Sequence, residues 1–121
     1  MSVVTLDELR ALLDEGAVTL LDVRSAAEYA GEAGYPCDPR QGHIPGARNL
    51  DVGELTARSA DDIRALVGEP AGTLVVAYCH SGGRSARAAE MLRAAGYDAR
   101  NYVGSWHEWS SRPDLAVDPR P

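Results

Sequence analysis

The residue best suited to chemistry is Cys79, which stands between an apolar run and a short glycine-rich segment. The apolar run, 73–77, predicts a strand buried on both faces, because a half-exposed strand would alternate polar and apolar residues. Residues 80–83 must then form a tight turn, and helical spacing begins at Arg84. Backbone N–H groups at the start of a helix, together with the Arg84 guanidinium, favour an anion. We therefore predict that the Cys79 thiol ionises below the ordinary pKa of about 8.5 and acts as a nucleophile.

The length of this loop discriminates between the groups that Cys79 could carry. Four residues separate Cys79 from Arg84, whereas the phosphate cradle of cysteine phosphatases is one residue longer. The smaller ring of amides suits a terminal sulfur atom better than a tetrahedral phosphate. The loop residues that we expect to contact the transferred sulfur or its donor are His80, Ser81, Gly82, Gly83, Arg84 and Ser85.

Strand and helix patterns alternate around the loop. Strands are predicted at 18–21, 47–50, 73–77 and 99–103, and Arg100 and Asn101 place the last of these at or near a sheet edge. Helices are predicted after Thr5, after Ser25, after Ser59, after Arg84 and after Gly104. The alternation predicts a three-layer α/β sandwich with a five-stranded, mostly parallel sheet and helices on both faces. The 121 residues fit a single domain, with 112–121 as an extended tail that contains proline.

Four motifs, in this order, resemble those of the rhodanese-like sulfurtransferases. They are Leu21-Asp22-Val23-Arg24 with Glu28-Tyr29, Gly42-His43-Ile44-Pro45-Gly46-Ala47, the loop from Cys79 to Arg84, and Gly104-Ser105-Trp106-His107-Glu108-Trp109 with Arg112-Pro113-Asp114-Leu115. The last segment is most similar to the catalytic C-terminal half of tandem thiosulfate sulfurtransferases, whereas Gly82-Gly83-Arg84-Ser85 is commoner in single-domain members. The resemblance implies a rhodanese-like fold and a Cys79 persulfide that needs no cofactor. Its sulfur would come from thiosulfate, with mercaptopyruvate as the alternative donor, and would pass to cyanide or a thiol.

Two further residues are candidates for contact with the substrate. Arg24 follows the strand at 18–21, and in open α/β sheets such turns face the ligand. It either contacts the donor or, as the favoured interpretation, forms an ion pair with Asp22 that holds the turn. Trp106 shares a helical face with Trp109 and either packs in the core, which is its default role, or lines the cysteine pocket.

The other histidine and cysteine candidates receive structural interpretations. His43 is expected to hold its glycine- and proline-containing turn rather than to act as a base. Cys37 lies in the loop 32–41 and is expected to be an ordinary loop thiol rather than a cysteine that resolves the persulfide. Two widely separated cysteines form neither a zinc knuckle nor a disulfide framework, so we expect no metal.

Composition limits the classes of partner. The net charge of −6 and the pI near 4.9 argue against nucleic acid or an anionic membrane as the main partner. The N-terminal residues do not resemble a signal peptide, and no run approaches the ~18 apolar residues of a membrane span, so we expect a cytoplasmic protein. Two functional alternatives stay open, namely a non-enzymatic persulfide carrier that serves a protein partner and a phosphatase or redox enzyme that uses the same thiolate.

Overall fold

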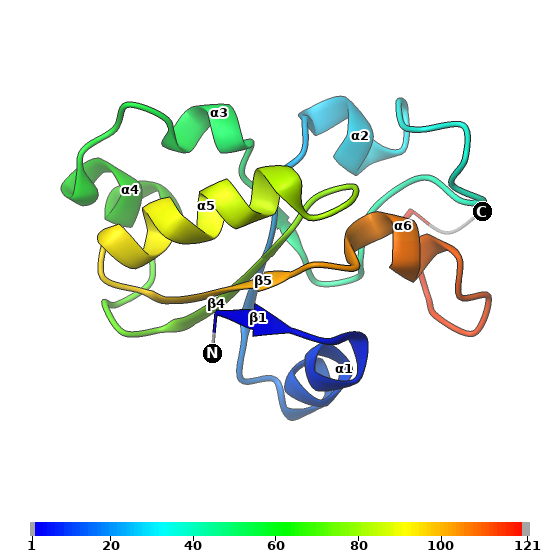
Figure 1. Ribbon diagram of the computed structural model, residues 1–121, viewed down its shortest axis with the longest axis horizontal. Coiled ribbons are helices and arrows are strands. Elements are labelled where there is room, and N and C mark those ends of the chain that lie inside the picture. Colours follow the sequence, from blue (N-terminus) through cyan, green and yellow to red (C-terminus); the bar gives the residue numbers. More distant parts are fainter. Residues whose placement is uncertain (1, 120–121) are drawn as a thin grey trace.

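In the computed structural model, which describes residues 2–119, five strands form one sheet in the order β1-β5-β4-β2-β3 (Figure 1). The strands are β1 (Val3–Val4), β2 (Thr19–Asp22), β3 (Arg48–Asn49), β4 (Leu74–Tyr78) and β5 (Asp98–Tyr102). All neighbouring strands are parallel, which confirms the predicted sheet. Sequence patterns did not identify β1, because two residues are too short to establish a period; its position outside β5 makes β5 the near-edge strand that its charges predicted.

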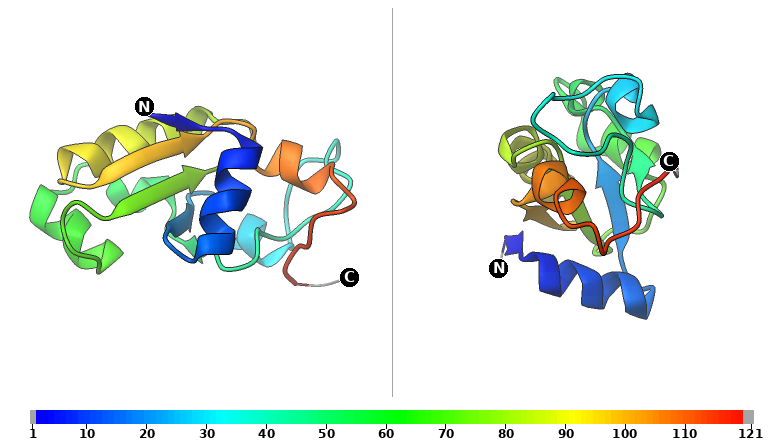
Figure 2. Two further views of the ribbon diagram at one scale, coloured as in Figure 1. Left: turned by 90° about the horizontal axis from the view of Figure 1, so that it is seen from below. Right: turned by 90° about the vertical axis from the view of Figure 1, so that its right-hand side faces the viewer.

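Helices cover both faces of the sheet, as predicted (Figures 1 and 2). The face below the sheet in Figure 1 carries α1 (Leu6–Glu15), and α6 (Ser105–Ser110) packs with it in the same apolar cluster. The opposite face carries α3 (Val52–Leu55), α4 (Ala60–Val67) and α5 (Gly83–Ala94). Between β2 and β3 the chain forms α2 (Ala26–Ala30). The predicted caps are present, since Thr5 accepts a hydrogen bond from the backbone of Glu8 and Ser59 accepts one from that of Asp62.

The side chains of the central strand β4 alternate strictly between the two faces of the sheet, and this alternation positions Cys79. Val75 and Ala77 pack toward α4 and α5, whereas Val76 and Tyr78 pack toward α1 and α6. Cys79 follows directly and belongs to the cluster of Val75 and Ala77. Because successive side chains of a strand point to opposite faces, the register of β4 directs the thiol toward the start of α5.

The C-terminal segment differs from the extended tail that was predicted. Turns follow Arg112, and Leu115 and Val117 are buried in the core. Asp118 then pairs with His43 through backbone hydrogen bonds in both directions. The apolar side chains draw the segment back onto the domain, while residues 120–121 of the predicted tail lie outside the described part of the chain. None of the helices within residues 2–119 has the length and apolar character needed to cross a bilayer.

Candidate active site

The backbone of Cys79 is fixed by the start of α6. Its N–H donates to Ser105 Oγ at 3.1 Å, and its carbonyl oxygen accepts from the Trp106 N–H at 2.8 Å. The Ser105 hydroxyl in turn donates to the Tyr102 carbonyl at 2.8 Å, so Ser105 bridges the ends of β4 and β5. Ser105 has a φ of 56°, an unusual value for a residue with a side chain. Sequence analysis missed Ser105, because its position in the 104–109 run indicated an ordinary helix start.

The thiol of Cys79 points into the loop that follows it. Its Sγ accepts a hydrogen bond from the Gly82 N–H at 3.1 Å and one from the Ser85 hydroxyl at 3.3 Å. Burial raises the pKa of the Cys79 thiol, but hydrogen bonds from the Ser85 side chain and from the amides of Ser85, Gly82 and Ser81 outweigh it. The pKa is therefore lowered from its ordinary value, in the direction expected from the sequence.

Gly82 is required by the shape of this loop. It adopts a φ of 99°, and a Cβ at this position would lie 2.9 Å from the Val103 carbonyl oxygen. Its own carbonyl accepts from Asn101 Nδ2 at 3.1 Å and from the Ala86 N–H at 3.0 Å, which starts α5. By contrast, a Cβ at Gly83 would meet open space among the described residues. The two glycines therefore have different roles, and only Gly82 needs the left-handed conformation.

Arg84 forms a bidentate ion pair with Glu28 of α2. The two N–H···O distances are 2.8 and 3.1 Å, and Glu28 also accepts from the backbone of Ser25. Chiefly through the Arg84 hydrogen bond, the pKa of Glu28 falls to about 2, and the pKa of Arg84 is raised. Attraction to the Cys79 thiolate contributes to the raised pKa of Arg84, whereas the pKa of Cys79 is set chiefly by burial and by hydrogen bonds to its sulfur. The direct contacts at Sγ therefore stabilise the thiolate more than Arg84 does, because Glu28 neutralises much of the guanidinium charge.

The Arg84 charge that was expected beside the thiolate is therefore shared with Glu28. Sequence analysis did not identify Glu28 as its partner, nor the cap that Ser25 and Glu28 form at the start of α2. The pair connects α2 to the entrance of the loop.

Arg24 lies in the interior rather than at the entrance. Its side chain is 1% exposed and forms an ion pair with Asp22 at 2.6 Å, and it also donates to the Gly42 carbonyl at 2.5 Å. Tyr78 donates its hydroxyl to the same carboxylate at 2.8 Å and accepts from the Ile44 N–H. This network holds the ends of β2 and β4 against the 42–47 turn. This ion pair agrees with the favoured interpretation of Arg24, and a contact between its guanidinium and the donor stays a prediction.

Trp106 and His43 also hold structural positions. The Trp106 indole is fully buried in the cluster with Tyr78, and its Nε1 donates to the Arg40 carbonyl at 3.0 Å. This agrees with the default interpretation of Trp106 as a core residue, and its place in the wall of the cysteine pocket stays a prediction. His43 is stacked on Tyr29 with ring centroids 3.7 Å apart and contacts the Tyr29 carbonyl through Nδ1.

His80 and Ser81 lie at the entrance of the loop. The His80 ring is stacked on Tyr35 at 3.7 Å, and Ser81 is exposed. Next to them is a hollow of about 300 Å³. Two residues that line it contact the loop, since Glu28 pairs with Arg84 and Tyr35 stacks on His80. Its lining residues are Ser25, Glu28, Ala33, Gly34 and Tyr35.

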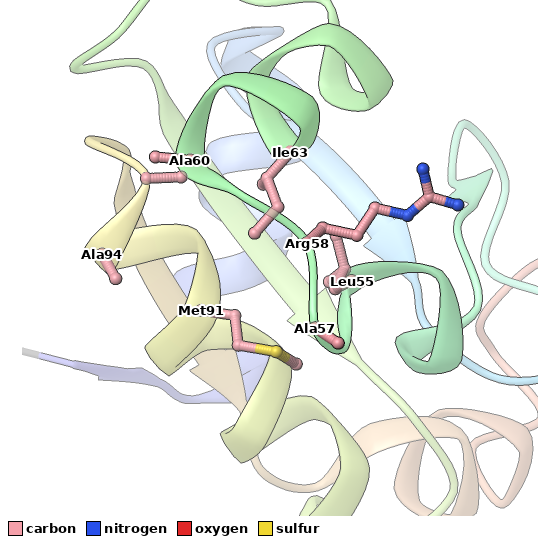
Figure 3. Close-up of a pocket in the computed structure, with 8 residues that line it drawn as sticks. Leu55, Ala57, Arg58, Ala60, Ile63, Met91 and Ala94 are labelled. Carbon is pink, nitrogen blue, oxygen red and sulfur yellow. The ribbon is translucent and has the colours of Figure 1, made fainter.

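A second hollow, of about 230 Å³, lies between the α3–α4 connection and α5 (Figure 3). Leu55, Ile63 and Met91 give it an apolar wall, and the Arg58 guanidinium points away from Met91. None of the residues that line it belongs to the cysteine loop. The hollow beside Glu28 and Tyr35 differs in that these two lining residues contact Arg84 and His80 of the loop.

A parallel α/β sheet whose central strand ends in a buried thiol surrounded by amides defines a protein built to carry a group on cysteine. The chain belongs to the rhodanese-like domain family, because the sequence model of that family matches residues 5–112.

Among curated relatives, "Sulfur carrier protein TtuD" of Thermus thermophilus is 40% identical in an alignment of 114 positions, and the match covers 80% of this chain and 40% of the relative. Human "Thiosulfate:glutathione sulfurtransferase" is 37% identical and covers 88% of this chain and 90% of the relative. The chain thus spans about two fifths of TtuD, whereas it spans nearly all of the human protein.

Solved structures agree with this assignment. A crystal structure of a probable thiosulfate sulfurtransferase has a TM-score of 0.84 and 39% identity, and the match covers 98% of this chain and 48% of the other. The human single-domain sulfurtransferase has a TM-score of 0.74 and 34% identity, with 94% and 99% coverage.

Proposed function

We propose that this protein is a thiosulfate sulfurtransferase that works through a Cys79 persulfide. The observation that carries the proposal is the position of Cys79 Sγ, which accepts hydrogen bonds from Gly82 N–H and Ser85 Oγ inside the loop. Those donors stabilise an anionic sulfur at this point. The proposal also draws on the activity named for the human relative, of which this chain covers 90%.

The first half-reaction loads the cysteine. The Cys79 thiolate attacks the outer sulfur of thiosulfate, a new S–S bond forms, and the bond to the sulfonate sulfur breaks. Sulfite leaves with the electron pair of that bond. We propose no general base, because the hydrogen bonds to Sγ lower the pKa of the Cys79 thiol and favour its thiolate. The outer sulfur then lies among the amides of residues 81–85, a ring that contains the start of α5.

The second half-reaction returns the thiolate. Cyanide, or the thiolate of an acceptor, attacks the outer sulfur, and Cys79 leaves with the electron pair. The products are thiocyanate or an acceptor persulfide.

The donor is proposed to enter past His80 and Ser81, with its sulfonate toward Arg84. Within the described residues Arg84 donates to Glu28 through Nη1 and Nη2, and its remaining N–H groups suit an anionic donor. The negative charge of the whole chain gives no long-range attraction, so the local field of the loop must supply it.

A persulfide carrier that serves a protein acceptor is the second candidate, and one observation favours it. The relative at 40% identity is named a sulfur carrier protein. In both candidates the acceptor reaches the exposed side of the loop, where Ser81 and Gly83 face solvent. We place the protein in the cytoplasm, because reduced cysteines, such as the unpaired Cys37 and Cys79 among the described residues, persist there.

Intact-protein mass spectrometry tests the proposal. After treatment with thiosulfate and removal of excess donor, the native chain should gain the mass of one sulfur atom, and Cys79→Ser should gain none. A native chain that stays unmodified would refute both candidates. Steady-state transfer from thiosulfate to cyanide then separates them: rapid turnover supports the enzyme, whereas loading without turnover supports the carrier. Hydrolysis of an aryl phosphate that depends on Cys79 would instead support the phosphatase alternative.

A further inference from the structure

Four side chains with metal-binding atoms meet at the entrance of the cysteine loop, outside the ring of amides. They are Cys37, Asp38, His80 and His107, and the ligand atoms of all four lie within 4.8 Å of one another. They come from three parts of the chain: the loop 32–41, the cysteine loop and α6. Sequence patterns did not indicate this cluster, because its ligands come from distant parts of the chain and include a single cysteine.

Asp38 is at the centre of the cluster and has an unsatisfied atom. Its side chain is 1% exposed, and Oδ1 contacts His107 Nδ1 at 2.8 Å and His80 Nε2 at 3.2 Å. Oδ2 lies 3.0 Å from His80 Nε2, but the angles there do not make a hydrogen bond, so Oδ2 is buried without a hydrogen-bond partner among the described residues. A buried carboxylate oxygen of this kind suits a cation.

The segments that carry these ligands are held in place by contacts of their own. Arg40, next but one to Asp38, donates to the carbonyl oxygens of Trp109, Ser110, Arg112 and Leu115. The Trp106 indole donates to the Arg40 carbonyl, and the His107 N–H donates to the His80 carbonyl at 3.0 Å. The cluster therefore does not depend on a metal to bring its parts together, which lowers the cost of ordering a site.

We propose that Cys37, Asp38, His80 and His107 form a binding site for a divalent cation of the zinc class. One thiolate, one carboxylate and two imidazoles are a donor set that zinc binds in tetrahedral geometry. Zinc–ligand bonds of about 2.0–2.3 Å place tetrahedral ligands roughly 3.3–3.8 Å apart. The present separations of up to 4.8 Å require a contraction of about 1 Å, which rotation of the exposed Cys37 and His107 side chains can provide.

The position of the site has a functional consequence that rests on the proposed sulfur transfer. His80 directly follows Cys79, so a cation bound by the His80 ring occupies the entrance through which donor and acceptor pass. Zinc should therefore slow the loading of Cys79, and a chelator should restore it.

Binding is measured in the Cys79→Ser chain, so that the active-site thiol cannot itself hold the metal. Titration calorimetry should give about one zinc per chain, and Co²⁺ should produce visible ligand-field bands with a thiolate charge-transfer band. Adding Cys37→Ser should abolish the charge-transfer band and weaken zinc binding at least about tenfold. Adding His107→Ala should weaken binding to a similar extent. The matched control is Asp114→Asn, an exposed carboxylate outside the cluster, which should leave the affinity unchanged.

Circular dichroism and the melting temperature verify that each variant is folded. The site would be overturned if the Cys79→Ser chain failed to bind zinc, or if adding Cys37→Ser or His107→Ala left its affinity unchanged, and Asp38 would then be only a hydrogen-bonding centre. Inhibition is tested separately by the rate of persulfide formation. Zinc should slow the native chain and affect Cys37→Ser at least about tenfold less; equal inhibition would assign the effect to Cys79 and refute a block at the entrance. Persulfide formation on Cys79 is measured first without zinc. Failure of the sulfur-transfer proposal can therefore be distinguished from failure of the zinc-site proposal.

Discussion

Replacing Ser85 with alanine should make the Cys79 thiol harder to ionise. The substitution removes the Oγ–Sγ hydrogen bond of 3.3 Å and keeps the amides that also face the sulfur. A hydrogen bond to a charged group contributes about 1.5–3 kcal/mol, and sulfur accepts weakly, so the lower value applies. Since one pKa unit corresponds to about 1.4 kcal/mol, the pKa of Cys79 should rise by about one unit.

The rate of thiol alkylation as a function of pH measures this change. At pH values below both midpoints, the Ser85→Ala chain should react about tenfold more slowly, because its thiolate fraction is that much smaller. At high pH the two rates should converge. Ser81→Ala is the matched control, since Ser81 is exposed and contributes through its amide rather than its hydroxyl. An unchanged or lower midpoint in Ser85→Ala would refute the account of how the thiolate is stabilised.

Four further substitutions test the surroundings of the loop. Gly82→Ala should lower the stability in thermal unfolding by about 1–3 kcal/mol and abolish most of the persulfide formation seen by mass spectrometry. Gly83→Ala should keep the native stability and the native persulfide formation. Equal behaviour of the two variants would contradict the strain argument. The pKa of Glu28, lowered from 4.5 to about 2, means that its ion pair stabilises the fold above about pH 4.5 and that this contribution is lost as pH falls toward 2. Glu28→Gln should therefore unfold about 1 kcal/mol more easily at neutral pH, with screening included, and the difference from the native chain should shrink in acid; a constant difference would contradict the pairing. Arg24→Ala leaves Asp22 buried without its cation and should cost about 3–5 kcal/mol in denaturant unfolding; a stable variant with only a raised KM would support Arg24 as a substrate contact.

Local patterns were sufficient for most of the fold. The apolar run before Cys79 identified β4, and the Thr5 and Ser59 caps identified the starts of α1 and α4. These features depend on residues close in the chain, so a sequence displays them directly. The helix α3 was missed because it has four residues and thus no apolar period to detect.

The site was predictable only where its chemistry is contiguous. The spacing from Cys79 to Ser85 indicated the ring of amides, but the Arg84–Glu28 pair and the Asp38 cluster join residues more than forty positions apart. No local pattern encodes such contacts. For Arg24 the sequence favoured the pair with Asp22, but its place after β2 could not reveal that Nη2 also donates to the Gly42 carbonyl.

The contacts of Ser105 and Trp106 with the Cys79 backbone also bear on the order in which the nucleophile is assembled. The loop and its helix leave the ribosome well before the residues that anchor them. Until the last helix is synthesised and docks, the Cys79 amide lacks its native acceptor and the thiol is not held among its donors. A nascent chain should therefore carry an ordinary, weakly reactive cysteine, and sulfur chemistry should begin only after α6 has been synthesised and has docked.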